Sequence, residues 1–166
     1  MVKIIPFQTK YQAKVNLLLV EIAKEFQDPI STPSPSPSTT AISKVLDNYW
    51  IALEGEVVVG TVAIMKIKAE YAILKKMFVR KSHRGKAKGI ANLLLDTAFQ
   101  WCKQEKISTI FLGTMLQFKG AHRFYGKNGF QEIDESVLPA DFIHNPIDEV
   151  FYVKDIFAED GKSAEQ

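Results

Sequence analysis

Residues 77–102 read MFVRKSHRGKAKGIANLLLDTAFQWC, and their pattern changes from strand-like to helical across a short basic loop. The loop contains Gly85 and Gly89, and after Gly89 the apolar side chains recur at spacings of three and four. The first N–H groups of a helix have no partner inside the helix, and the helix dipole adds partial positive charge there. A strand, a glycine-containing basic loop and a helix in this order predict a binding site for a pyrophosphate.

Other phosphate-binding loops fit this stretch less well. The GxxxxGK[ST] pattern is absent, which disfavours a nucleotide hydrolase of the P-loop class. A dinucleotide fold requires GxGxxG after the first strand of a parallel sheet, and that spacing fails here. The alternative interpretation is a solvated basic turn that only precedes a core helix.

Upstream of the loop, the chain begins with a short edge strand over residues 2–6 and a helix over residues 9–27, for which Thr9 is a candidate cap. One face of that helix is apolar, formed by Val15, Leu18, Leu19, Ile22 and Ala23. A short helix is expected over residues 39–47. Three strands follow as an antiparallel meander, over residues 49–53, 57–68 and 72–80, with Glu54 and Gly55 in the first turn.

Downstream of Gly89, the expected elements are a helix over 89–105, a strand over 107–113, a helix over 119–128 and strands over 130–133 and 149–154. Residues 135–147 are irregular. The apolar stripe of the 89–105 helix is Ile90, Leu93, Leu94, Ala98, Trp101 and Cys102. The order β-α-α-β-β-β-α-β-α-β-β predicts an α/β sandwich on a mixed, strongly twisted central sheet flanked by helices.

The chain length of 166 residues predicts one domain covering residues 1–166, with a flexible tail over 156–166. Residues 31–40 read STPSPSPSTT, which cannot sustain a helix or a central strand. We expect an exposed loop there. The alternative is a mobile lid over a substrate cleft.

Composition excludes several classes of protein. Hydrophobic residues make up 46% and the net charge is +2, so neither disorder nor nucleic-acid binding is indicated. The single cysteine and three scattered histidines disfavour a disulfide framework and a metal site. The sequence contains neither an apolar run long enough to span a membrane nor a secretory signal, so we expect no membrane partner and a cytoplasmic location.

A second motif follows in the stretch GAHRFYGKNGFQEI, residues 120–133. A [Q/R]xxGx[G/A]-type loop followed about 30 residues later by AxxFYxxxGF resembles the GNAT superfamily, the N-acetyltransferases that use acetyl-CoA. The resemblance extends from about residue 45 to 153, and it rests on both motifs occurring in this order. It implies the twisted mixed sheet of that family and an acetyl-CoA cosubstrate without a metal.

The resemblance also implies a set of site residues. Backbone groups of Met77, Phe78 and Val79 would bind the pantetheine arm as an added strand does. The pyrophosphate would be held by the loop and first helical turn, formed by Arg84, Gly85, Lys86, Ala87, Lys88, Gly89, Ile90, Ala91 and Asn92. Tyr125 would be catalytic and protonate the leaving thiolate, and the thioester would lie between the central strands, beyond Val79 and about Thr114.

Three departures from the family pattern leave alternatives open. Two extra residues lengthen the loop, so Arg84 and Lys86 compete for its first position. Phe118 replaces an asparagine that is common in the family. Ile73 stands where many members have a glutamate as general base. The candidates for that base are Glu70, His83, Glu25, Asp28 and Asp148.

The resulting hypothesis is an N-acetyltransferase that passes acetyl directly to a primary amine in a ternary complex, without a covalent enzyme intermediate. The acceptor would be a small molecule or a peptide, and the protein a monomer or a homodimer. The alternatives are a non-catalytic acyl-CoA-binding or regulatory module, and an interaction protein that docks through the Ser/Pro loop at residues 31–40.

Overall fold

The computed structural model describes residues 1–26, 48–85, 89–116, 118–142 and 148–157. The expected 31–40 loop, the 39–47 helix, the 158–166 part of the tail, and the loop residues Lys86, Ala87 and Lys88 lie outside these ranges. The elements are β1 Val2–Pro6, η1 Thr9–Tyr11, α1 Gln12–Phe26, β2 Asn48–Glu54, β3 Val57–Lys66, β4 Tyr71–Val79, η2 Lys81–His83, α3 Ile90–Gln104, β5 Thr109–Thr114, α4 Lys119–Lys127, β6 Gln131–Ile133, η3 Glu135–Val137 and β7 Val150–Asp155.

The strands form one hydrogen-bonded sheet in the order β1-β2-β3-β4-β5-β7-β6. The β1–β2, β2–β3, β5–β7 and β6–β7 pairs are antiparallel, whereas β4 and β5 are parallel over Tyr71–Ile73. The α/β prediction of a mixed sheet flanked by helices is therefore confirmed.

The chain divides into two compact units. The first unit comprises Met1–Met65 and Leu74–Gln100, and the second comprises Lys66–Ile73 and Trp101–Gln166. The assignment of residues 1–166 to a single domain stays a prediction.

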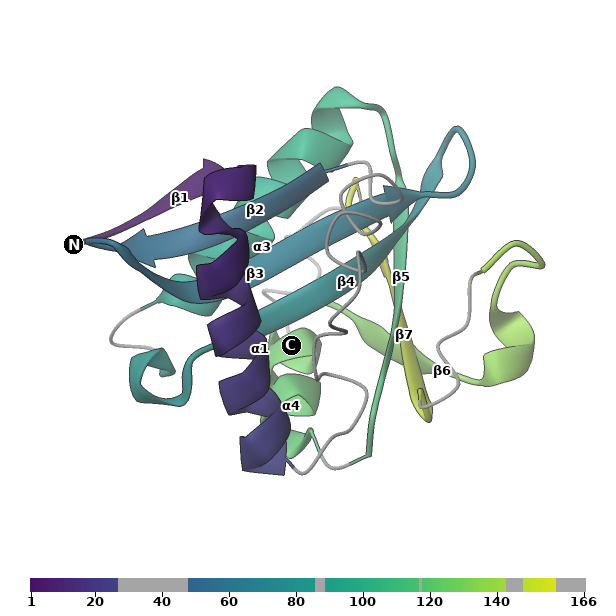
Figure 1. Cartoon of the computed structure of the whole chain (residues 1–166). Helices are drawn as coiled ribbons and strands as arrows, with labels where there is room; N and C mark the ends of the chain where they lie inside the picture. The colour runs from purple at the N-terminus through teal and green to yellow at the C-terminus, as the bar shows by residue number, and fades with distance from the viewer. Residues whose placement is uncertain (27–47, 86–88, 117, 143–147, 158–166) are drawn as a thin grey trace. The chain divides into compact units, whose positions relative to one another are not determined.

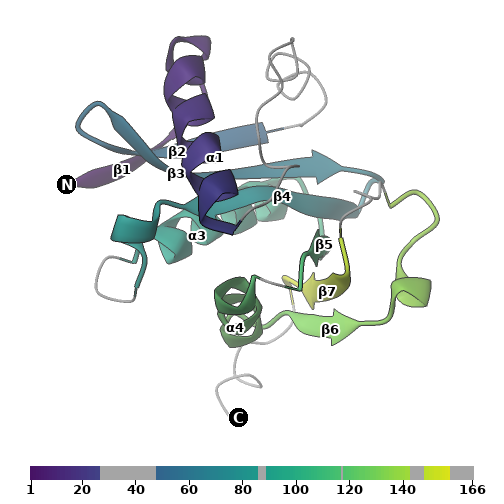
Figure 2. The same cartoon turned by 60° about the horizontal axis from the view of Figure 1, so that its bottom comes forward.

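In the first unit, α1 lies against one face of the strands and α3 against the opposite face (Figures 1 and 2). The apolar face predicted for α1 is buried, because each of its five residues is at most 7% exposed. The predicted Thr9 cap is wrong: Thr9 lies inside η1, whose N-cap residue is Gln8. The expected turn after β2 forms around Gly55, whose φ is +63°.

The α3 stripe was predicted correctly only in part. Ile90, Leu94 and Ala98 are buried, but Leu93 is 45% exposed and Leu95 is buried instead. Leu94 explains this rotation, because its Cδ1 lies only 2.9 Å from the position that a Cβ on Gly60 would occupy. Leu94 therefore packs against the β3 backbone at Gly60, which has no side chain. This contact centres the buried face of α3 on Leu94.

In the second unit, α4 packs on β7 through aromatic rings. The ring of Tyr125 lies 5.7 Å from that of Tyr152 and 5.5 Å from that of Phe130, between ring centroids. Phe130 also donates its backbone N–H to the Tyr125 carbonyl at 3.0 Å, which turns the chain from α4 into β6. Burial of these rings fixes α4 against the strands of its own unit.

Candidate functional site

The basic loop connects β4 to α3 through two glycines with left-handed backbone. Gly85 has a φ of +113° and Gly89 a φ of +61°, conformations that other residues adopt only with strain. The Gly89 N–H donates to the Gly85 carbonyl at 3.2 Å, and the Gly89 carbonyl accepts from the Leu93 N–H at 3.0 Å. Gly89 thus directs the chain into α3, whose first N–H groups have no acceptor within the helix.

The strand segment proposed to bind pantetheine follows a backbone irregularity. Lys76 has a φ of +55° inside β4, a left-handed value that is unfavourable for a residue with a Cβ. Its carbonyl accepts the Thr61 hydroxyl at 2.6 Å, which stabilises this conformation. Met77 and Phe78 are half-buried and Val79 is buried. The irregularity lies in β4 immediately before these three residues.

Two arginines near the loop bind carboxylates one turn apart on α1. The Arg80 Nε donates to Glu21 at 2.9 Å, and this hydrogen bond holds the pKa of the Glu21 carboxyl below its ordinary value. The Arg84 Nη2 donates to Glu25 at 2.7 Å, and its Nε donates to the Val79 carbonyl at 2.9 Å. The Arg84 guanidinium therefore fixes the loop to α1 and to the end of β4.

Tyr125 lies on α4 and is 6% exposed. Burial raises the pKa of its phenol above the ordinary value, and the charges of Asp148 and Tyr152 raise it further. The hydroxyl is therefore protonated throughout the neutral range, as a general acid must be at the start of its step.

The five candidates for the general base occupy different environments. His83 Nε2 lies 2.7 Å from the Glu54 carboxylate, and Glu25 binds Arg84. Glu70 is exposed, and Asp28 lies outside the described residues. Asp148 is half-buried and lies against Gly113 of β5.

The residues that depart from the family pattern are structural here. Ile73 is fully buried in β4, so its position belongs to the core. Phe118 is the N-cap residue of α4, without a side-chain hydrogen bond to the helix.

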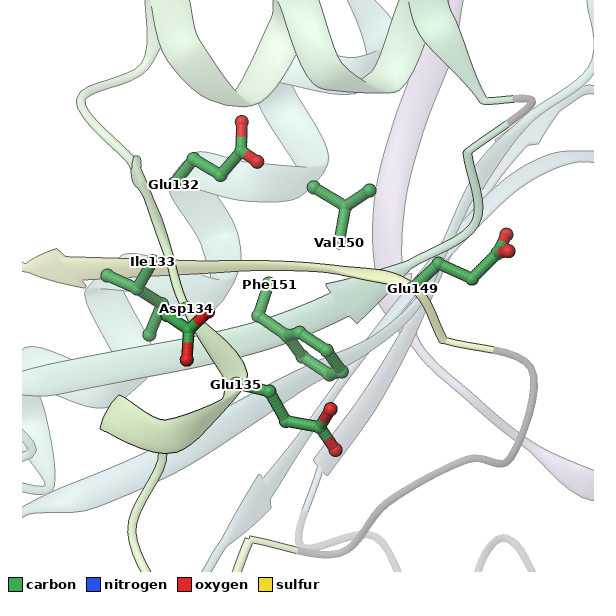
Figure 3. Close-up of a pocket in the computed structure, with 7 residues that line it drawn as sticks. All are labelled: Glu132, Ile133, Asp134, Glu135, Glu149, Val150 and Phe151. Atoms are coloured by element: carbon green, nitrogen blue, oxygen red, sulfur yellow. The ribbon is translucent and has the colours of Figure 1, made fainter.

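A cavity of about 470 Å³ in the second unit is lined by four acidic residues together with Ile133, Val150 and Phe151 (Figure 3). The carboxylates belong to Glu132, Asp134, Glu135 and Glu149. Two of them have structural roles: Asp134 accepts the Ser136 N–H at 3.0 Å, and Glu149 accepts the Leu116 N–H at 3.1 Å. The motifs in the sequence do not indicate this cavity. Its sequence signal is the group of acidic residues in the stretch QEIDE, residues 131–135.

Cys102 is fully buried, and burial together with the nearby Glu105 raises the pKa of its thiol to about 12. A thiol in this state is a poor nucleophile at neutral pH. Among the residues that the structure describes, no three His, Cys, Asp or Glu side chains are grouped as metal ligands. None of the helices in these ranges combines the length and hydropathy needed to cross a membrane.

A family model and a curated relative each match about half of this chain. Residues 46–132, more than half of the chain, match the family model described as an acetyltransferase (GNAT) domain. Mouse (Mus musculus) N-acetyltransferase 8 is 36% identical over 95 residues, which are 54% of this chain and 41% of that protein. The chain therefore spans about two fifths of the length of that relative.

Solved structures match over nearly the whole chain. A GNAT-family acetyltransferase from Staphylococcus aureus Mu50 superposes with a TM-score of 0.86 at 30% identity, covering 94% of this chain and 99% of that one. A GNAT-family acetyltransferase from Elizabethkingia anophelis, crystallised with acetyl-CoA bound, has a TM-score of 0.64 at 17% identity and covers 93% of this chain and 97% of that one. The second likeness establishes the fold alone.

Proposed function

The chain belongs to the GNAT acetyltransferase family, and from this membership we propose that it transfers an acetyl group from acetyl-CoA to a primary amine. The transfer is direct, within a ternary complex of protein, acetyl-CoA and acceptor. The acceptor is a small molecule or a peptide that carries a protonated amine before reaction.

One observation supports this proposal most strongly: the Gly85–Gly89 loop leads into the first turn of α3, with both glycines in left-handed conformations. The N–H groups of Ile90, Ala91 and Asn92 are the donors for the pyrophosphate of CoA, and Gly89 leaves room for close approach. Arg84 binds Glu25, so we assign the first position of the loop to Lys86 rather than to Arg84. Lys86, Ala87 and Lys88 add donors and positive charge to the same loop.

The segment Met77–Val79 binds the pantetheine arm through backbone hydrogen bonds, as an added strand would. The left-handed Lys76 supports this assignment, because strained backbone is common at ligand sites and is stabilised here by Thr61.

Tyr125 donates a proton to the thiolate of CoA as it leaves. Its burial supports this role, because a buried phenol remains protonated and lies in a low-dielectric environment where the hydrogen bond to a thiolate is strong. No acetyl-cysteine intermediate is involved, since Cys102 is buried and its thiol stays protonated. Positioning of the two substrates supplies much of the acceleration.

The proposal is tested by measuring CoA thiol release from acetyl-CoA with a panel of amines: spermidine, benzylamine, ethylamine and hydroxylamine. We expect amine-dependent thiol release and the matching acetylated product by mass spectrometry. The absence of acetyl-CoA binding at millimolar concentration by calorimetry would contradict the proposal.

The alternative is a non-catalytic acyl-CoA-binding module, and the buried Ile73 at the family's glutamate position favours it. The two functions differ in one result. A binding module binds acetyl-CoA in calorimetry but releases no thiol with any amine of the panel.

A further inference from the structure

A ligand that adds to a sheet as a strand binds backbone groups that point away from the neighbouring strand. We propose that Tyr49 and Thr61 are positioning residues that aim these groups in the Met77–Val79 segment at the pantetheine arm. The inference rests on the proposed binding of acetyl-CoA. It follows from two hydrogen bonds that connect Tyr49 and Thr61 to the backbone of Lys76, directly before the segment.

Thr61 is fully buried in β3, where the other residues from Val58 to Ile64 are apolar. A buried hydroxyl is unfavourable unless it is hydrogen-bonded, whereas a valine would fill nearly the same space without a polar group. The Thr61 hydroxyl donates to the Lys76 carbonyl at 2.6 Å. The hydroxyl at this core position is therefore accounted for by its bond to the β4 backbone.

Tyr49 on β2 extends this connection. Ile51 lies opposite Thr61 in the register of β2 with β3, and Tyr49, two residues before Ile51, points to the same face. A side-chain hydrogen bond joins Tyr49 and Thr61. Because Thr61 donates its single hydroxyl proton to Lys76, the Tyr49 hydroxyl is the donor to Thr61. The two hydroxyls thus form a directed chain of hydrogen bonds from β2 through β3 to the backbone of β4.

The Tyr49 phenol is held in place as a donor. It is 8% exposed, and burial raises its pKa above the ordinary value, so the hydroxyl keeps its proton at neutral pH. The centroid of its ring lies 5.2 Å from that of Phe7, and the Phe7 N–H donates to the Tyr49 carbonyl at 2.8 Å. These contacts fix the backbone and the ring of Tyr49, and through them the orientation of Thr61.

Lys76 is the residue of β4 that requires this support. Its φ of +55° is left-handed, and in that conformation the Cβ of an L-residue comes too close to the following carbonyl oxygen. Strained backbone persists where the surrounding structure holds it in place. The hydrogen bond from Thr61 holds the carbonyl of Lys76 itself, and Tyr49 orients the hydroxyl that makes this bond.

The peptide group after Lys76 transmits this constraint to the binding segment. The Lys76 carbonyl and the Met77 N–H belong to one planar trans peptide group, in which they point in opposite directions. Because the carbonyl is directed at Thr61 on β3, the Met77 N–H points away from β3, towards the other edge of β4. In the described residues, the register with β5 on that edge covers Tyr71–Ile73 and does not reach Met77. Thr61 therefore aims the first backbone donor of the segment at the edge where an added strand would bind.

The experiment compares two ligands that differ in the arm. Acetyl-CoA carries both the arm and the pyrophosphate, whereas 3′-phosphoadenosine 5′-diphosphate carries the pyrophosphate without the arm. The dissociation constant of each ligand is measured by calorimetry for the wild type, Thr61→Val, Thr61→Ser and Tyr49→Phe. The matched control is Thr97→Val, because Thr97 also donates its hydroxyl to a backbone carbonyl, that of Leu93 at 2.8 Å, but within α3.

We expect Thr61→Val to raise the dissociation constant of acetyl-CoA by about ten-fold, as the loss of one hydrogen bond to the arm would, and to leave that of 3′-phosphoadenosine 5′-diphosphate nearly unchanged. Tyr49→Phe should shift the same ratio of the two constants in the same direction but by less, because Thr61 can still donate to Lys76. Thr61→Ser keeps a hydroxyl donor and should resemble the wild type, as should Thr97→Val.

An equal rise of both dissociation constants in Thr61→Val would overturn the role, because it would indicate a general structural effect. An unchanged dissociation constant of acetyl-CoA, or a Thr61→Ser variant as weak as Thr61→Val, would also overturn it. If Thr61→Val does not fold, Tyr49→Phe decides through the same ratio. Failure of the proposed function is separate, because it shows in the wild type: that protein would bind acetyl-CoA and release no thiol with any amine.

Discussion

Tyr125 is the residue on which most of the proposed chemistry depends, and its surroundings are aromatic. Phe124, Phe130 and Tyr152 all have ring centroids within 6 Å of its ring. Such an environment keeps the phenol neutral, because ionisation would place a charge among apolar rings. The same rings hold it in one orientation, which a proton donor requires.

Replacing Tyr125 with Phe tests its role directly. We expect kcat to fall by about 100-fold, within the range of general-acid catalysis, because the ring packing is kept and only the proton donor is lost. The dissociation constant of acetyl-CoA, measured by calorimetry, should change little. An unchanged kcat in steady-state thiol release would remove the role assigned to this hydroxyl.

Three buried tyrosines predict how stability depends on alkaline pH. Burial raises the pKa of Tyr49, Tyr125 and Tyr152 above the ordinary value of about 10. Below that pH the folded and unfolded states are both protonated, so these groups do not affect stability. Above it only the unfolded state ionises, and each tyrosine lowers the free energy of unfolding by about 1.4 kcal/mol per pH unit.

Tyr125→Phe should therefore reduce the slope of unfolding free energy against pH between about pH 10 and 11, measured by urea denaturation. Below pH about 9 the slope of the variant should equal that of the wild type. Equal slopes in the alkaline range as well would show that the phenol ionises equally in both states.

At the scale of single residues, the sequence predicts the features that depend on neighbouring positions in the chain. The motif around Tyr125 can be identified from the sequence alone. The same is true of Ile73, which stands where many family members have a glutamate. From the sequence, Asp148 is only one of five candidates for the general base, because its position against Gly113 depends on residues far apart in the chain. The partners of Arg84 were equally hidden, since Glu25 lies on a helix that no motif connects to the loop.

Among the elements, α1 has a part beyond covering the sheet: its Glu21 and Glu25 bind Arg80 and Arg84 at successive turns. The backbone at Arg80 is already held by a hydrogen bond from its N–H to the Val59 carbonyl at 2.8 Å. Arg84 is adjacent to Gly85 and lies inside the loop. The Glu25 pair should therefore order the loop before acetyl-CoA binds, whereas the Glu21 pair should not.

Glu25→Gln should raise the KM for acetyl-CoA several-fold with little change in kcat, because the loop must then be ordered by the cosubstrate itself. The matched control is Glu21→Gln, which breaks the corresponding pair one turn away and should leave that KM unchanged. Each change should cost at most about 1 kcal/mol of stability, as expected for partly exposed ion pairs. Equal KM values in the two variants would contradict this role of the helix.

Element boundaries followed from periodicity and turn residues, and their errors have physical causes. Leu93, Leu94 and Leu95 are consecutive, so the pattern alone permits a buried face that includes either outer leucine. The choice is made by Gly60 on β3, which admits Leu94 and rotates α3 accordingly. The apolar periodicity of one helix carries no information about the shape of the surface against which that helix packs.

For the molecule as a whole, the sequence predicts one domain, and the described contacts form two compact units. Each unit contains one tryptophan, Trp50 in the first and Trp101 in the second. Fluorescence can therefore follow the unfolding of each unit separately.

Urea unfolding of Trp50→Phe and Trp101→Phe tests cooperativity, because each variant keeps one reporter. If residues 1–166 form a single cooperative domain, the fluorescence transition of each variant should coincide with its own transition in circular dichroism. A fluorescence midpoint displaced from the circular dichroism midpoint in either variant would mean that the units unfold independently.

Catalysis as proposed depends on the anchoring of CoA by its pyrophosphate at the start of α3. The most direct measurement is a calorimetric titration of the protein with acetyl-CoA and, in parallel, with acetyl-pantetheine, which has the same thioester and arm but no pyrophosphate. We predict micromolar binding of acetyl-CoA and no detectable binding of acetyl-pantetheine at the same concentrations. Equal affinity for the two compounds, or no binding of acetyl-CoA, would contradict the account.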